Sequence, residues 1–136
     1  MTVPKALRRV VAERAGGCCE YCLLDEPDSY TPHQVDHIVS QKHGGTSDSQ
    51  NFAWACTRCN SWKGSDASAI AFRTSCPETG EAVPLFHPRR HGSEEHFELR
   101  GYRIEPLTPI GAATVRLLRL NADQRIAERR ILDPRS

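Results

Sequence analysis

The sequence predicts a small α+β domain built around a cluster of cysteines, and three observations support this fold class. Apolar residues recur at helical spacing near both ends of the chain, so we expect helices on either side of its centre. Alternating apolar residues between 34 and 40 favour a short strand in the centre. Two Cys-x-x-Cys pairs flank that strand and offer the four ligands of a structural zinc ion: Cys19, Cys22, Cys56 and Cys59.

The composition fits a single domain spanning residues 1–136. Its hydrophobic content of 38% is modest for a core, so we expect a metal ion to help hold the chain together. The 18 Lys and Arg nearly balance the 17 Asp and Glu, and the net charge of +1 gives no overall basic field for nucleic acid. From Gly101 onward, however, seven Arg stand against four acids, which leaves room for a local basic face.

The cellular compartment bears on the chemistry of the cysteines. The first residues lack the apolar run of a signal peptide, and no stretch approaches the ~20 apolar residues of a membrane span. We therefore expect a cytoplasmic protein with no membrane partner. In a reducing compartment, paired cysteines are more often zinc ligands than disulfides.

The first predicted element is an N-terminal helix over residues 3–15. Thr2 can cap this helix, Pro4 suits its first turn, and the Gly16-Gly17 pair ends it. The helix therefore ends where the cysteine motif begins.

The central elements are two strands and a helix. We expect strands at 34–40 and 51–56, joined by a loop that contains Gly44-Gly45. Residues 60–63 favour a helical turn that Gly64 stops. The predicted order is cysteine pair, strand, loop, strand, cysteine pair and helix, within a core of residues 18–66.

The C-terminal extension, residues 67–136, is expected to be a mixture of elements. We expect a weak helix at 66–73 and a turn-rich stretch at 76–84. A hairpin around Arg100-Gly101 should follow at 96–106, with two helices beyond 108. Thr108-Pro109 is a good helix start, and Asn121 is expected to break that helix and cap the last one.

Zinc bound by two Cys-x-x-Cys pairs has a complete tetrahedral shell, so the site is expected to be structural. The 33 residues between Cys22 and Cys56 exceed the spacing of a short zinc ribbon, so the ion must join two elements around a large insertion. Cys18 could replace Cys19 as a ligand, but the turn is better suited by two residues between the paired cysteines, as between Cys19 and Cys22, than by three. Together with Cys76, Cys18 is expected to be an ordinary reduced thiol.

The insertion and the second cysteine pair contain a spaced set of motifs. They are Asp36-His37-Ile38, Gly44-Gly45, Asn51-Phe52 and Cys59-Asn60-x-x-Lys63-Gly64. With the cysteines, this ordered set resembles the HNH endonuclease family over about a third of the chain. The resemblance implies a ββα-metal (His-Me finger) core around a catalytic divalent ion, flanked here by an N-terminal helix and a C-terminal hairpin plus helices.

The resemblance also implies roles for individual residues in cleaving nucleic acid phosphodiesters. Asp36 and Asn60 match the ligands of the catalytic ion, and His37 matches the general base. Asn51 matches the residue that steadies the active-site loop, and Lys63 matches a basic position near the phosphate.

The chemistry of these side chains supports those roles. A neutral imidazole such as His37 can accept a proton at pH 7. The carboxylate of Asp36 and the amide oxygen of Asn60 are hard ligands that suit Mg²⁺ or Mn²⁺. Adjacent strand residues point to opposite faces, so Asp36 and His37 can share a site only where the strand twists or ends.

Two functions therefore stand open. The first is a metal-dependent endonuclease acting on DNA, whose near-neutral charge favours a homodimer or a partner protein to assist binding. The alternative is a catalytically inert, zinc-stabilised module that binds nucleic acid or protein. A pure binding module has no need for Asp36, His37, Asn51 and Asn60 together, which favours the endonuclease.

Overall fold

The computed structural model describes residues 3–39, 41, 44–69, 73–75, 79–80 and 82–135. Its helices are α1 (Lys5–Arg14), α2 (Thr57–Ala69), α3 (Ser93–His96), α4 (Pro109–Leu117) and α5 (Asp123–Leu132), with 3-10 turns η1 (Glu26–Asp28) and η3 (Ser49–Asn51). Its strands are β1 (Gln34–His37), β2 (Phe52–Ala55), β3 (Arg73–Ser75), β4 (Ala82–Pro84), β5 (Phe97–Arg100) and β6 (Arg103–Pro106). The predicted α+β class is confirmed. Among these helices, none is long and apolar enough to cross a membrane.

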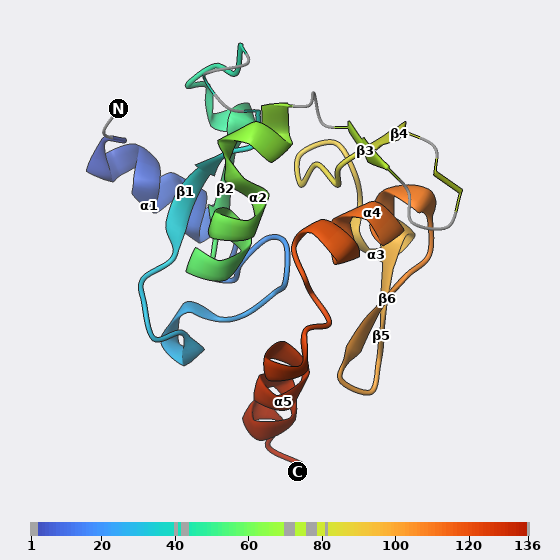
Figure 1. Ribbon diagram of the computed structural model, residues 1–136. Coiled ribbons are helices and arrows are strands. Elements are labelled where there is room, and N and C mark those ends of the chain that lie inside the picture. Colours follow the sequence, from blue (N-terminus) through green and yellow to red (C-terminus); the bar gives the residue numbers. More distant parts are fainter. Residues whose placement is uncertain are drawn as a thin grey trace.

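The β1–β2 hairpin forms the centre of the N-terminal half, with α1 and α2 beside it (Figure 1). Its strands are antiparallel, and the register pairs Gln34 with Ala55 and His37 with Phe52. β1 ends at His37, earlier than the predicted strand end at residue 40, which itself lies outside the described residues.

Helix α1 packs against β2 through an apolar face. Val11 is fully buried in a cluster with Phe52 and Trp54. The Arg14 guanidinium donates to the Phe52 carbonyl at 2.8 Å, which fixes the end of the helix on the strand. The helix begins at Lys5, so Pro4 lies at its N-cap and not in its first turn as predicted, and the predicted cap Thr2 lies outside the described residues.

Helix α2 starts immediately after the third cysteine of the cluster. Its backbone leaves helical geometry at Gly64, where φ is 58° and ψ is 164°, a conformation that glycine adopts without a steric penalty. The predicted break at Gly64 is therefore present, but the helix resumes beyond it as far as Ala69.

The described part of the C-terminal extension adds the strand pairs β3–β4 and β5–β6 and the helices α3, α4 and α5. β5 and β6 form the predicted hairpin, and Thr108 caps α4 by accepting a bond from the Gly111 amide at 3.0 Å. The stretch predicted to be only turns contains β4, which pairs with β3. The cap predicted for the last helix is wrong, because the Asn121 side chain instead bonds both the amide and the carbonyl of Ile104 at 2.8 Å.

The largest apolar cluster joins the two parts of the chain. It contains the cysteines and Ile38 from the central region, and Phe86, Ile104, Leu118 and Leu120 from the extension. The extension thus covers the cysteine cluster and contributes to the same core. Figure 1 shows α4 near α2, and an ion pair joins Arg58 of α2 to Glu128 of α5.

Candidate metal centre and active site

Four cysteines converge into one buried cluster. The sulfur atoms of Cys19, Cys22, Cys56 and Cys59 all lie within 4.8 Å of one another. The Sγ atoms of Cys22 and Cys56 are 3.7 Å apart. A tetrahedral site with Zn–S bonds of ~2.3 Å requires S–S edges of roughly 3.8 Å, so the donor set fits a zinc ion.

The two turns that present these sulfurs share the same local geometry. In each pair the amide of the second cysteine points at the sulfur of the first, at 3.5 Å for Cys22 and Cys19 and at 3.4 Å for Cys59 and Cys56. Cys18 lies outside the cluster, as expected, and its thiol bonds Asp25 at 2.8 Å. That bond to a carboxylate raises the pKa of Cys18 to about 11, which keeps the thiol protonated. Cys76 lies outside the described residues.

Arg125 is the one charged side chain of α5 that reaches the cluster among the described residues. Its guanidinium donates to Cys59 Sγ at 3.2 Å and lies 3.9 Å from Cys56 Sγ, and it also donates to the Leu118 carbonyl at 2.8 Å. Burial would lower the pKa of Arg125, but the thiolate charge of Cys59 and Cys22 outweighs burial and raises it. No local pattern predicts this contact, because 66 residues separate Arg125 from Cys59.

Asp36 is held between the first cysteine pair and α2. The hydroxyl of Tyr21 donates to Asp36 Oδ2 at 2.7 Å, and the Lys63 ammonium lies 3.2 Å from the same oxygen. Burial raises the pKa of the Asp36 carboxyl, and the charge of Lys63 opposes that rise. Tyr21 was not among the predicted site residues, although its place between Cys19 and Cys22 fixes it beside Asp36.

Lys63 lies inside the protein, with only 4% of its surface exposed. Besides Asp36, its ammonium donates to the carbonyls of His37 at 3.0 Å and Ile38 at 2.9 Å. These contacts tie α2 to the end of β1 and direct the charge of Lys63 inward.

His37 is the last residue of β1, and its ring packs edge-on against Phe52 with centroids 4.8 Å apart. Its Nε2 atom is buried and has no hydrogen-bond partner among the described residues. Burial lowers the pKa of His37, with a small opposing effect from Asp36. The imidazole is therefore neutral at pH 7 and has a nitrogen able to accept a proton.

Asn51 fastens the loop that follows β1. Its amide oxygen accepts from the Val39 amide at 2.9 Å, and its amide nitrogen donates to the carbonyls of Val39 at 2.9 Å and Thr46 at 2.8 Å. One side chain thus bonds the backbone at both ends of a loop between residues 39 and 46.

Asn60 lies one helical turn before Lys63 and faces the start of β1. Its amide nitrogen donates to Gln34 Oε1, and within the described part of the chain no hydrogen bond joins it to Asp36. The structure therefore brings Asp36, Lys63 and the end of β1 into contact. Asn60 flanks this group, while the His37 ring packs on Phe52.

Comparison with known proteins gives one match. Residues 19–66 match the family model described as HNH endonuclease. No curated protein and no solved structure matches the chain. The matched segment contains all four clustered cysteines and extends two residues beyond Gly64. Residues 19–66 are therefore similar to the HNH endonuclease family, and this segment contains a four-cysteine cluster suited to zinc.

Proposed function

We propose that this protein hydrolyses phosphodiester bonds of DNA, with His37 as the general base. The observation that carries the proposal is the His37 imidazole, which stands at the end of β1 inside an HNH segment, with a lowered pKa and an unpartnered Nε2 atom among the described residues. A buried imidazole without a partner is costly, so such a nitrogen favours a chemical role.

The proton transfer assigned to His37 is simple. A water molecule attacks phosphorus and its proton passes to the imidazole. The bond to the 3′ oxygen breaks, and that oxygen leaves with the bonding electrons and takes a proton from solvent water. Because burial lowers the pKa of His37 below its ordinary value, the neutral base form of the imidazole predominates at pH 7. A positioned base of this kind contributes typically ~10²–10⁴-fold to the rate.

Asp36 and Asn60 are proposed to hold a divalent ion, Mg²⁺ or Mn²⁺. Asp36 Oδ2 is occupied by Tyr21 and Lys63, whereas among the described residues Oδ1 has only the 3.4 Å contact with Lys63. Asn60 uses its amide nitrogen for Gln34, which leaves its oxygen for an ion. When bound, such an ion would supply positive charge for the phosphate in the transition state.

Asn51 and Lys63 are proposed to hold the other groups of the site in position. Asn51 holds the loop after β1, and Lys63 holds Asp36 together with the carbonyls of His37 and Ile38. Lys63 is buried in these contacts, so we assign it to positioning Asp36 in preference to direct contact with a phosphate.

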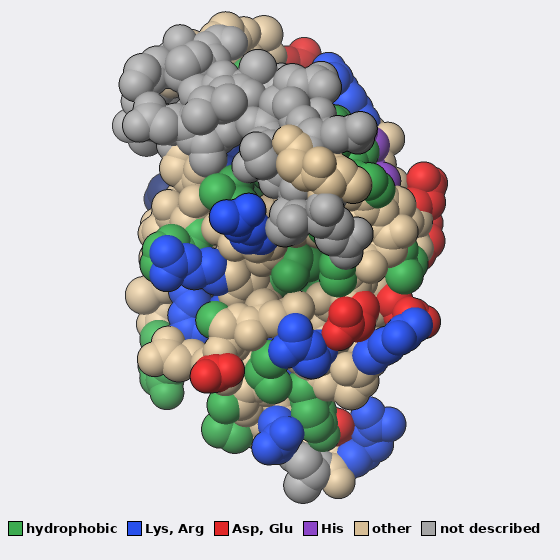
Figure 2. Space-filling model, turned by 45° about the vertical axis from the view of Figure 1, so that its right-hand side comes forward, with side chains coloured by type: hydrophobic (Ala, Val, Ile, Leu, Met, Phe, Trp, Pro, Cys, Tyr) green, Lys and Arg blue, Asp and Glu red, His purple; other side chains and the backbone are tan. Residues whose placement is uncertain are grey.

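A second candidate is a zinc-stabilised module that binds DNA without cleaving it. The observation that favours it is that Asp36 and Asn60 each already have protein partners. The net charge of +1 gives little general attraction for DNA, and basic and acidic side chains are interspersed on the face shown in Figure 2. This favours a homodimer or a partner protein in either function.

Plasmid cleavage by the parent and by His37→Ala distinguishes the two candidates. With zinc loaded and Mg²⁺ or Mn²⁺ added, the parent should nick supercoiled DNA, and His37→Ala should be slower by ~10²–10⁴-fold at unchanged zinc content. Equal rates for the two proteins would rule out the general base. DNA binding without any cleavage by the parent would support the second candidate.

A further inference from the structure

The C-terminal extension reaches the cysteine cluster through Arg125. This side chain is 6% exposed and comes from α5, whereas the sulfurs come from the two cysteine turns. Its guanidinium spans two elements, donating to Cys59 Sγ at 3.2 Å and to the Leu118 carbonyl at 2.8 Å. A long side chain buried in this way makes contacts that nothing in the nuclease chemistry requires.

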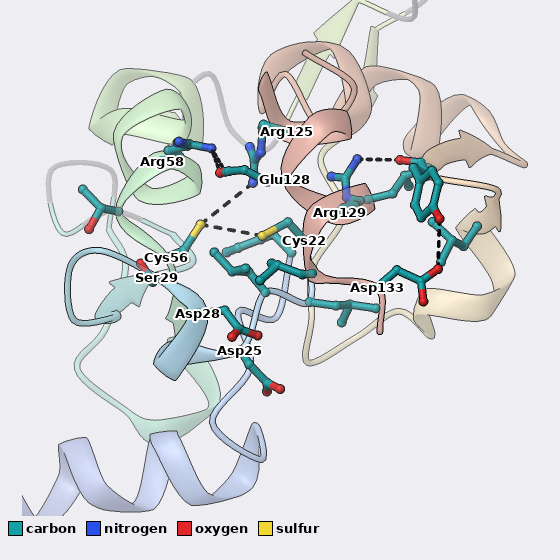
Figure 3. Close-up of a pocket in the computed structure, with 18 of the residues that line it drawn as sticks. Cys22, Asp25, Asp28, Ser29, Cys56, Arg58, Arg125, Glu128, Arg129 and Asp133 are labelled. Atoms are coloured by element: carbon teal, nitrogen blue, oxygen red, sulfur yellow. Dashed lines mark hydrogen bonds and ion pairs between the residues drawn. The ribbon is translucent and has the colours of Figure 1, made fainter. Parts of the chain in front are cut away.

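A cavity of about 650 Å³ opens beside the cluster. Its wall includes Cys22 and Cys56 together with Arg125, and further residues come from β5, β6 and α5. Figure 3 shows Arg125 extending from α5 toward the sulfur of Cys56, which also lies close to the sulfur of Cys22. The guanidinium thus stands where the cavity meets the sulfurs.

We propose that Arg125 is an outer partner of the zinc site, so that α5 belongs to the zinc-binding unit of this chain. Arg125 stabilises the thiolates by hydrogen bonding and charge, and it limits access to them from the cavity. This inference does not depend on the nuclease function.

The charge balance explains why such a partner is needed. Four thiolates around one Zn²⁺ ion leave excess negative charge in an apolar core, and burying that charge is costly. A guanidinium at 3.2 Å offsets part of the charge and donates a charge-assisted bond. Changes to such outer partners typically lower metal affinity by ~10–100-fold.

Arg129 provides a matched control on the same helix. It lies one turn after Arg125 and is partly buried, and it donates to the carbonyls of Tyr102 at 3.0 Å and Leu120 at 2.6 Å. Within the described residues it has no hydrogen bond to a cysteine sulfur. Arg129→Met should therefore loosen α5 without removing a bond to the cluster.

The experiment measures zinc affinity by competition with a chromogenic chelator, in the full chain. Arg125→Met should bind zinc ~10–100-fold more weakly than the parent, and Arg129→Met should stay within about threefold. Arg125→Lys keeps the positive charge but not the planar guanidinium with its paired donors. Its zinc affinity should therefore lie between those of the parent and Arg125→Met. If Arg125→Met fails to fold, a reduced zinc affinity of Arg125→Lys decides the question.

Cobalt substitution gives a readout that a purely structural role would not change. Hydrogen bonding lowers the energy of the sulfur lone pairs, so its loss in Arg125→Met should move the thiolate-to-cobalt charge-transfer band to lower energy. Arg129→Met should leave the band in place. Parental zinc affinity in both Arg125 variants, an unshifted band, or an equal loss of affinity in Arg129→Met would overturn the proposal.

Discussion

Replacing Lys63 by Met should destabilise the fold more than replacing any other lysine among the described residues. The substitution keeps the length and apolar stem of the side chain and removes only its charge. It leaves the buried Asp36 carboxylate with Tyr21 as its remaining partner, and it frees the carbonyls of His37 and Ile38. Unfolding by urea, followed by tryptophan fluorescence, measures the effect.

The magnitude follows from the burial of the pair. Lys63 is 4% and Asp36 is 7% exposed, and removing one partner of a buried ion pair costs about 3–5 kcal/mol. For a chain of 136 residues this corresponds to a fall in Tm of roughly 10–17 °C. Lys5→Met, at an exposed position on α1, is the control and should change stability by less than ~0.5 kcal/mol.

The loss of stability in Lys63→Met should depend on pH, and its direction follows from the pKa of Asp36. Burial already raises the folded-state pKa of Asp36, and Lys63 opposes that rise, so Lys63→Met should raise it further. A carboxyl whose folded pKa exceeds its unfolded pKa binds more protons when folded, and stability therefore increases as pH falls through the folded pKa. The stability gap between Lys63→Met and the parent should narrow from pH 7 to pH 5.

A double variant separates the ion pair from simple packing. Asp36→Asn combined with Lys63→Met removes both charges and should recover part of the stability lost in the single variant. If Lys63→Met unfolds within 1 kcal/mol of the parent at pH 7, or if the gap widens on acidification, the reasoning about this buried pair is refuted.

Further predictions concern the zinc, the base and one close contact. Cys22→Ser should lose zinc and unfold the core, since structural zinc supplies roughly 10–16 kcal/mol of apparent binding free energy; about one zinc per chain by atomic absorption would contradict this. The cleavage rate should rise with pH through an inflection below pH 6.5, because burial lowers the pKa of His37; an inflection above pH 7 would refute its role as base. Gly111→Ala would place its Cβ 2.2 Å from the His96 carbonyl oxygen and should cost ~1–3 kcal/mol in thermal unfolding; parental stability would show that the helix can shift.

The cysteine cluster and the central hairpin were predictable because local patterns determine them. The spacing within each Cys-x-x-Cys pair presents two sulfurs on one turn, and alternation around Val35 and His37 marks the strand. The end of that strand was less predictable, because there Lys63 of α2 donates hydrogen bonds to the carbonyls of His37 and Ile38, which are distant in the sequence.

Long-range partners were not predictable from spacing. Arg125 has the sequence context of a helix-surface residue, and only the folding of the extension over the cysteines buries it. Asn121 looked like a helix cap but bonds the backbone of Ile104 in β6, because tertiary contacts override a local capping preference. The roles of Asp36, His37, Asn51, Asn60 and Lys63 in catalysis remain predictions.

The nuclease proposal is tested most directly by the initial rate of plasmid nicking by the zinc-loaded chain after other metals are removed. The account predicts no cleavage until Mg²⁺ or Mn²⁺ is restored, and then cleavage that Asn60→Ala abolishes while its zinc content stays at about one per chain. An Asn60→Ala protein that cleaves at the parental rate with Mg²⁺, or a parent that cleaves equally well without a restored ion, would contradict it.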